Sequence, residues 1–215
     1  QSVYPLLNNS AHIVCERVFL PEPAPKKQKP LRTVESGKRL TDADIIAFSL
    51  SFENDYPHIL SILDQIGLPL RAEHRSDQDP LLLAGGVASF INPEPIAAFF
   101  DCFLIGEAEV MLPRFLDVFE RGNDKHATLI YIARNVPGAY VPAFYSVDYQ
   151  RDGTIAAFHP LADVPPTVER TYLKDLTHTA TCSTILTPDT TFDQTYLVEV
   201  GRRCPHGCRF CSAGF

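Results

Sequence analysis

The sequence predicts an α/β fold in which a doubly wound, mostly parallel sheet is followed by a β-hairpin region. Over residues 1–135, short apolar runs alternate with segments whose apolar residues recur at helical spacing. Strands that alternate with helices are joined by right-handed crossovers and therefore lie parallel. Farther along the chain, two alternating runs flank an Asp-Gly turn, which is typical of a hairpin.

The first two predicted strands differ in their pattern. Residues 12–20 alternate and carry enough β-branched side chains to predict a strand, and a loop rich in proline and lysine follows at residues 21–30. Residues 44–50 contain a continuous apolar run. Such a run predicts a strand that is buried on both faces of a parallel sheet.

A helix is predicted after the second strand. Apolar residues recur at helical spacing over residues 56–66 and stop at Gly67, a residue type that commonly ends a helix. Asn54 and Asp55 are candidate N-caps because their short side chains accept hydrogen bonds from free backbone N–H groups.

The strand and helix unit then repeats. Residues 80–84 predict a strand that ends in Gly85-Gly86, residues 93–100 predict a short helix, and residues 102–105 predict a third strand. Glycines at the end of such a strand lie at the carboxyl edge of the sheet, where open α/β folds bind ligands.

Two further helices complete the predicted α/β region. Residues 107–120 are amphipathic and end at Gly122, although Pro113 indicates that this helix begins late, near Leu112. Residues 127–132 predict a short helix.

The remaining chain divides into two more predicted parts. Residues 136–194 hold a hairpin, with alternating runs at 143–149 and 154–158, and then a linker region for which no helix or strand is predicted. Residues 195–215 begin with a predicted strand at 196–200 and continue into a segment rich in cysteine.

Charge and hydropathy exclude several classes of protein. The chain has 215 residues with 19 basic and 26 acidic side chains, a net charge of −7, which argues against binding along nucleic acid phosphates. No apolar run approaches the roughly 20 residues of a membrane span, and no secretory signal opens the chain. We therefore expect a cytoplasmic protein. The first residue of the chain is Gln and its last residues directly follow a cysteine cluster, as expected of a piece of a longer protein.

Three of the six cysteines, Cys204, Cys208 and Cys211, fall within eight residues. Their C-x3-C-x2-C spacing after a predicted strand lets three thiolates converge on one soft metal centre. An iron–sulfur cluster, a zinc site completed by His206, and a redox pair of Cys208 and Cys211 all remain open on spacing alone. The other three cysteines are predicted to be small buried hydrophobic residues.

This segment carries a family resemblance. The stretch VEVGRRCPHGCRFCSAGF, residues 198–215, resembles the first strand and cluster loop of the radical S-adenosylmethionine superfamily. The resemblance implies that Cys204, Cys208 and Cys211 ligate a 4Fe-4S cluster, whose open iron chelates S-adenosylmethionine for reductive cleavage to a 5′-deoxyadenosyl radical. It also implies that Phe210 lies near the adenine, and that His206 is a loop residue and not a ligand.

Residues 10–125 resemble the N-terminal cobalamin-binding-like domain that is fused to many such enzymes. The resemblance rests on five short segments. They are residues 35–40, 48–53, 84–86, 92–95 and 101–109. It implies a Rossmann-like or flavodoxin-like fold, with Ser49, Gly85 and Gly86 as candidate cobalamin contacts at the carboxyl edge of the sheet.

The sequence also departs from cobalamin domains that bind through histidine. These carry Asp-x-His-x-x-Gly after their first strand, whereas Asp124-Lys-His126 lacks the glycine and lies elsewhere; the expected position precedes Gln1. Base-off cobalamin and a domain that has lost the cofactor are both compatible with the chain. Gly85-Gly86 also fits a tight turn equally well.

The function that follows is that of an N-terminal fragment of a radical S-adenosylmethionine enzyme, with cobalamin as an optional second cofactor and a flavodoxin or ferredoxin as an electron donor. We expect the fragment alone to be inactive, because the catalytic barrel needs several further βα units. No catalytic residue, substrate or oligomeric state follows from the sequence. The alternative is a non-catalytic α/β binding or scaffold protein with a structural zinc knuckle.

Overall fold

The computed structural model describes residues 2–21, 30–119, 124–177, 179, 181–188, 193–202, 204 and 206–210. Two compact units make up the chain. One runs from Glu16 to Tyr172, and the other combines Gln1–Cys15 with Leu173–Phe215.

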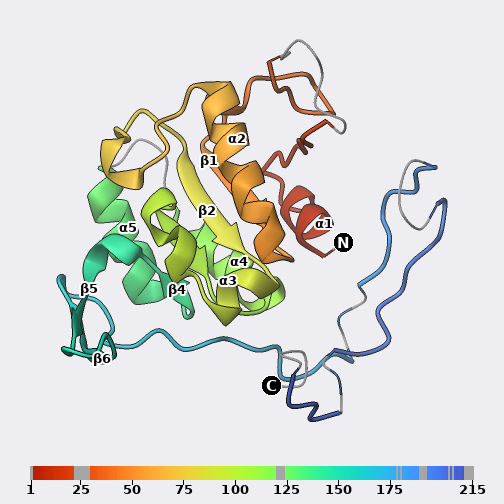
Figure 1. Cartoon of the computed structure of the whole chain (residues 1–215). Coiled ribbons are helices and arrows are strands. Elements are labelled where there is room, and N and C mark those ends of the chain that lie inside the picture. The colour runs from red at the N-terminus through yellow and green to blue at the C-terminus, as the bar shows by residue number, and fades with distance from the viewer. Residues whose placement is uncertain are drawn as a thin grey trace. The chain divides into compact units, whose positions relative to one another are not determined.

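A four-stranded sheet forms the centre of the Glu16–Tyr172 unit (Figure 1). Its strands lie in the order β1-β2-β3-β4, with β1 to β3 parallel and β4 antiparallel to β3. The strands are β1 Ile45–Ser49, β2 Leu81–Gly85, β3 Cys102–Leu104 and β4 Ala139–Tyr140. The predicted α/β fold with a mostly parallel sheet is confirmed.

The register brings the ends of the strands together. Ile45 lies opposite Leu81, and Ser49 lies opposite Gly85 at the carboxyl end of the same pair. On β2 and β3, Leu82 and Phe103 have no exposed surface, which explains why these strands are apolar without alternation.

The α-helices that the structure describes in this unit connect or flank the strands. They are α2 Tyr56–Ile66, α3 Val87–Ile91, α4 Ala108–Val118 and α5 Lys125–Asn135. Short 3-10 helices lie at Leu40–Asp42, Glu53–Asp55, Ala72–His74, Glu94–Phe99 and Pro142–Phe144. The predicted bounds of α2 are confirmed, including a left-handed Gly67 with a φ of 72° at its end.

Several predicted elements were wrong in type or extent. Residues 12–20 form no strand, because the backbone of Arg17 bonds to the turn at residues 34–35 and not to a neighbouring strand. The Arg17 N–H donates to Glu35 Oε2, and the Arg17 carbonyl accepts from the Val34 N–H. Asp55 makes no capping hydrogen bond, and a 3-10 turn precedes α2 instead. The helix predicted at 93–100 is also a 3-10 helix.

Helix α4 begins at Ala108 and continues through Pro113, so the late start predicted near Leu112 was wrong. Proline lacks the N–H that would bond to the carbonyl of Glu109 four residues earlier. Met111, Leu112 and Phe115 on either side of it are buried, and their packing offsets that loss.

The predicted hairpin is confirmed as β5 Tyr145–Tyr149 paired with β6 Ile155–Pro160. Its turn is closed by the Gln150 N–H, which donates to the Thr154 carbonyl at 2.8 Å. Asp152 Oδ1 accepts from the Thr154 N–H at 3.0 Å, and Gly153 adopts a φ of 83°.

The unit that combines Gln1–Cys15 with Leu173–Phe215 has few helices or strands among its described residues. Helix α1 covers Val3–Asn8, and the Asn8 side chain bonds to both the N–H and the carbonyl of Cys15. The strand predicted at 196–200 was wrong: Val198 forms a single antiparallel bridge with Cys182.

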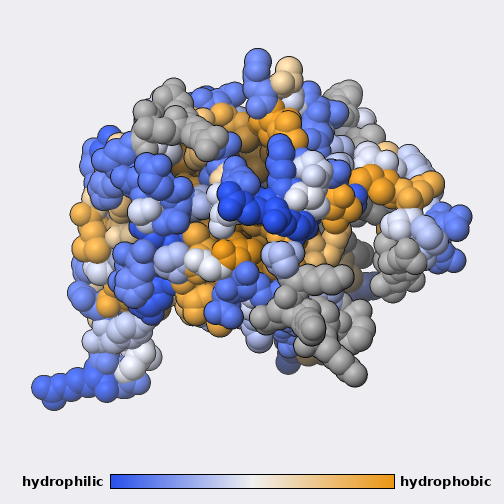
Figure 2. Space-filling view, turned by 90° about the horizontal axis from the view of Figure 1, so that it is seen from above, coloured by the Kyte–Doolittle hydropathy of each residue, from blue (hydrophilic) through white to orange (hydrophobic). Residues whose placement is uncertain are grey.

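The surface seen in Figure 2 mixes hydrophilic side chains with smaller apolar areas. Within the residues that the structure describes, every helix is too short or too polar to cross a membrane.

Candidate metal centre and the carboxyl edge of the sheet

A short antiparallel pairing lies directly before the cysteine segment. The Ser183 N–H donates to the Leu197 carbonyl at 2.9 Å, and the Glu199 N–H donates to the Thr181 carbonyl at 2.8 Å. The Ser183 hydroxyl also accepts from the Leu197 N–H at 3.0 Å. These bonds fix the backbone five residues before the first predicted ligand, Cys204.

Arg202 is bound to Glu199 in the same region. Its Nε lies 2.8 Å from Glu199 Oε1 and its Nη2 lies 3.0 Å from Oε2, the two-point geometry that arginine forms with carboxylates. The hydrogen bonds from Arg202 hold the pKa of Glu199 below its usual value. The Arg202 guanidinium thus braces the start of the cysteine loop. Arg203 lies outside the described residues.

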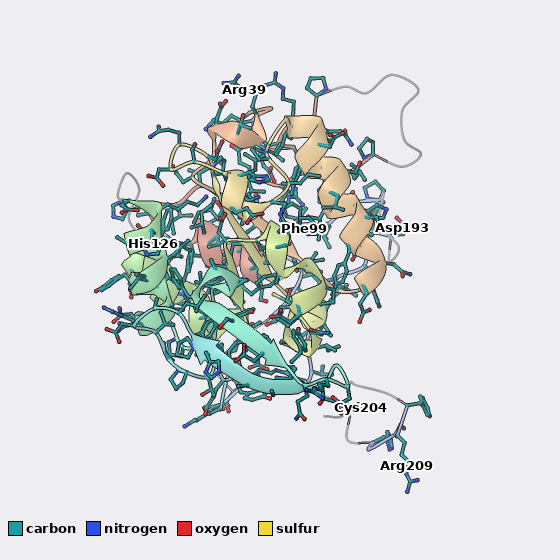
Figure 3. All side chains as sticks on the ribbon, turned by 60° about the vertical axis from the view of Figure 1, so that its left-hand side comes forward. Arg39, Phe99, His126, Asp193, Cys204 and Arg209 are labelled. Carbon is teal, nitrogen blue, oxygen red and sulfur yellow. The ribbon has the colours of Figure 1, made fainter. Side chains whose placement is uncertain are left out.

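Two of the three predicted ligands can be placed. Cys204 and Cys208 are exposed and form no disulfide, so both thiols are accessible to iron or zinc; Figure 3 labels Cys204 and the exposed Arg209 on the same segment. Cys211 lies outside the described residues. Among the residues that are described, no three His, Cys, Asp or Glu side chains are grouped as in a metal site.

Phe210 is 93% exposed and His206 is also exposed. An aromatic side chain of this exposure has its whole face available for stacking on a planar ring. The prediction that Phe210 contacts an adenine therefore stays a prediction that its accessibility permits.

The second predicted site lies at the carboxyl edge of the sheet. Ser49 and Gly85 are register partners at the ends of β1 and β2, and Gly86 follows as the residue before α3. The Leu50 N–H donates to the Gly85 carbonyl at 2.8 Å, and the Ala88 N–H donates to the Leu50 carbonyl at 3.1 Å. The structure therefore brings these three predicted residues together.

Gly86 meets the backbone of its own chain. It adopts a φ of +101°, and a Cβ on it would lie 2.5 Å from the Leu50 carbonyl oxygen and 2.8 Å from the Leu50 nitrogen. Only glycine fits this turn from β2 into α3.

Asp124 and His126 have a structural role that explains their spacing. Asp124 is the N-cap of α5 and accepts from the His126 N–H at 2.8 Å. The His126 ring packs against Phe144 with the ring centroids 5.2 Å apart.

The sequence did not predict two groups of interacting residues in the Glu16–Tyr172 unit. One is a buried ion cluster at the amino end of the sheet, formed by Arg75, Asp101 and Lys125. The other is Arg170–Tyr172, which pairs with Gly106 after β3. Neither has a local signature, because each joins residues far apart in the chain.

The fold and the cysteine segment together define an α/β domain that precedes a candidate metal-binding loop. Residues 1–142 match the family described as radical SAM proteins, N-terminal. The chain belongs to this family, and the resemblance seen in the sequence is confirmed to that extent.

A curated relative extends the likeness. The chain is 28% identical over 183 residues, or 84% of its length, to the uncharacterized protein MJ0966 of Methanocaldococcus jannaschii. The match covers 32% of that protein, so the chain spans about a third of its relative's length. No solved structure matches the chain.

Proposed function

We propose that the protein to which this chain contributes is a radical S-adenosylmethionine enzyme, and that Cys204, Cys208 and Cys211 hold its 4Fe-4S cluster. The observation that carries the proposal is a C-x3-C-x2-C segment that lies beyond a family N-terminal domain matched over residues 1–142. Two of its thiols, those of Cys204 and Cys208, are exposed and unbridged.

The donor chemistry of the segment fits such a cluster. Three thiolates are soft ligands suited to iron–sulfur centres, and three ligands leave one iron open for S-adenosylmethionine. When bound, the cluster supplies the electron for reductive cleavage of S-adenosylmethionine. Such thiols must stay reduced, so the proposal includes a cytoplasmic location and an electron donor of the flavodoxin or ferredoxin type.

The described residues of the chain have distinct parts in this proposal. The Glu199–Arg202 pair and the 181–183 pairing hold the backbone where the loop begins. Because Arg202 is bound to the Glu199 carboxylate, we assign it the role of orienting the loop and not that of contacting the substrate. Phe210 offers a stacking surface for the adenine. Turnover is assigned to the intact enzyme, and we expect this chain alone to be inactive.

The test is anaerobic reconstitution of the chain with iron and sulfide, followed by metal analysis. The chain is expected to bind about four iron atoms, and Cys204→Ala, Cys208→Ala and Cys211→Ala should each lose most of this iron. Cys15→Ala is the control, since Cys15 lies outside the motif and outside the 181–183 pairing, and should retain it. Stoichiometric zinc that iron does not replace would contradict the proposal and favour a structural zinc knuckle.

A further inference from the structure

A segment of the Glu16–Tyr172 unit covers the chain where it leaves β3. Thr171 forms a parallel bridge with Gly106. The Thr171 N–H donates to the Ile105 carbonyl at 3.1 Å, and the Glu107 N–H donates to the Thr171 carbonyl at 3.1 Å. We call residues 170–172 the strap; Figure 1 shows the chain passing below α3 after it leaves β6.

Two glycines make room for the strap. A Cβ on Gly106 would lie 2.7 Å from the Thr171 nitrogen and closer still to the Thr171 carbonyl and hydroxyl oxygens. A Cβ on Gly138 would lie 3.3 Å from Thr171 Cγ2 and 2.7 Å from the Ile105 carbonyl oxygen. Both residues also have a positive φ, of +142° and +81°. The close approach of Thr171 therefore requires glycine at position 106, whereas Gly138 is required mainly by the Ile105 carbonyl.

Arg170 fastens the strap to the helix that follows β2. Its guanidinium carbon lies 3.8 Å from the centroid of the Phe90 ring on α3 and 4.8 Å from that of Tyr172. Its Nε is buried and makes no hydrogen bond to any residue that the structure describes. Arg170 is therefore held by stacking on aromatic faces, for which its planar group is suited.

The glycines at this edge leave no cradle for a flat cofactor. The space beside Gly86 is filled by the Leu50 backbone, and the space beside Gly106 is filled by Thr171. A Cβ on Gly85 would meet the Leu104 carbonyl oxygen at 3.7 Å, which is ordinary contact with the protein itself. The room that the missing side chains of Gly86 and Gly106 leave is therefore taken up by the protein itself and is not open to a flat ring.

We propose that the strap is the resident occupant of the carboxyl end of β3 beside α3, and that this edge of the sheet binds the chain's own linker in place of cobalamin. The strap continues directly into residue 173 and the segment that carries the cysteines. The inference is independent of the metal that the cysteines bind.

The test is amide hydrogen exchange on the whole chain. The amides of Glu107 and Thr171 are expected to exchange at least about 100-fold more slowly than in an unstructured peptide, because both are bonded in the strap pairing. Gly106→Ala should abolish this protection while the Leu82 and Leu83 amides of β2 stay protected. Arg170→Leu, which removes the stacking without a backbone clash, should weaken it.

The control is Gly153→Ala, which also has a positive φ, of +83°, but no atom within 4 Å of the new Cβ, and it should leave the strap protected. Unprotected Thr171 and Glu107 amides in the unmutated chain, beside protected β2 amides, would overturn the proposal. So would retention of one equivalent of aquocobalamin by that chain on gel filtration while Thr171 stays protected. The expected result is no retention.

Discussion

At the scale of single residues, Asp101 organises the amino end of the sheet. Its Oδ2 accepts from the Leu82 N–H at 2.7 Å and lies 3.4 Å from Arg75 Nη2, and its Oδ1 lies 3.3 Å from Lys125 Nζ. The Arg75 side chain is fully buried and also donates to three backbone carbonyls. One carboxylate therefore compensates two cations that water reaches poorly.

Asp101→Asn is expected to lower the free energy of unfolding by about 3–5 kcal/mol, because it leaves the Arg75 charge buried without its partner. Urea denaturation measures this change. Asp163→Asn is the control: Asp163 pairs with Arg134, but its side chain is 92% exposed, so the cost should be about 1 kcal/mol or less. Similar small losses for both variants would contradict the assigned role of Asp101.

Tyr140 makes the stability of the folded protein depend on pH in the alkaline range. Its hydroxyl donates to Glu94 Oε1 at 2.5 Å, and its ring packs against those of Phe103 and Tyr145. Burial, together with the Glu94 carboxylate, raises the pKa of Tyr140 well above its usual value. Because the raised pKa belongs to the folded state, the stabilisation is complete below about pH 10 and is lost as the pH rises further.

Tyr140→Phe should lower the free energy of unfolding by about 1–2 kcal/mol at pH 8, since a hydrogen bond to a carboxylate is lost. Above pH 10 its stability should fall less steeply with pH than that of the unmutated chain. Urea midpoints measured from pH 8 to 11 test both statements, with the exposed Tyr131 changed to Phe as the control. Parallel curves for Tyr140→Phe and the unmutated chain would refute this account.

At the scale of elements, α4 contains a correctable defect. Pro113 is exposed and stands at the sixth position of the helix, where an N–H would otherwise bond to the Glu109 carbonyl. Pro113→Ala should therefore raise the free energy of unfolding by about 1–3 kcal/mol, measured by urea or thermal denaturation. Pro95→Ala, at the second position of a 3-10 helix, should change it by less than about 0.5 kcal/mol. A destabilised Pro113→Ala would show that the proline is required by its surroundings.

The elements that could be predicted are those whose signal is local. β1 and β2 are continuous apolar runs, α2 repeats at helical spacing up to a left-handed Gly67, and Asp152-Gly153 marks the hairpin turn. The two residues of β4 are too few to show a period. Residues 12–20 have the composition of a strand but bond to a turn, and only the folded structure shows this.

At the scale of the whole molecule, the candidate site also contains features that the sequence predicts and features that only the structure shows. The cysteine motif is local in the chain, so its spacing and the family resemblance could be read from the sequence. The strap could not, because Thr171 meets Gly106 across 65 positions and lies in a stretch without periodicity. Gly85-Gly86 could be placed at the sheet edge, but only the structure assigns the space beside Gly86 to Leu50.

The central claim is that the cysteine segment holds an iron–sulfur cluster with one open iron. Electron paramagnetic resonance of the reconstituted and reduced chain, recorded with and without S-adenosylmethionine, tests it most directly. The account predicts a reduced 4Fe-4S signal whose g-values shift when S-adenosylmethionine is added, because the molecule would ligate the fourth iron. A cluster signal that S-adenosylmethionine leaves unchanged, or a chain that takes up zinc in preference to iron, would contradict it.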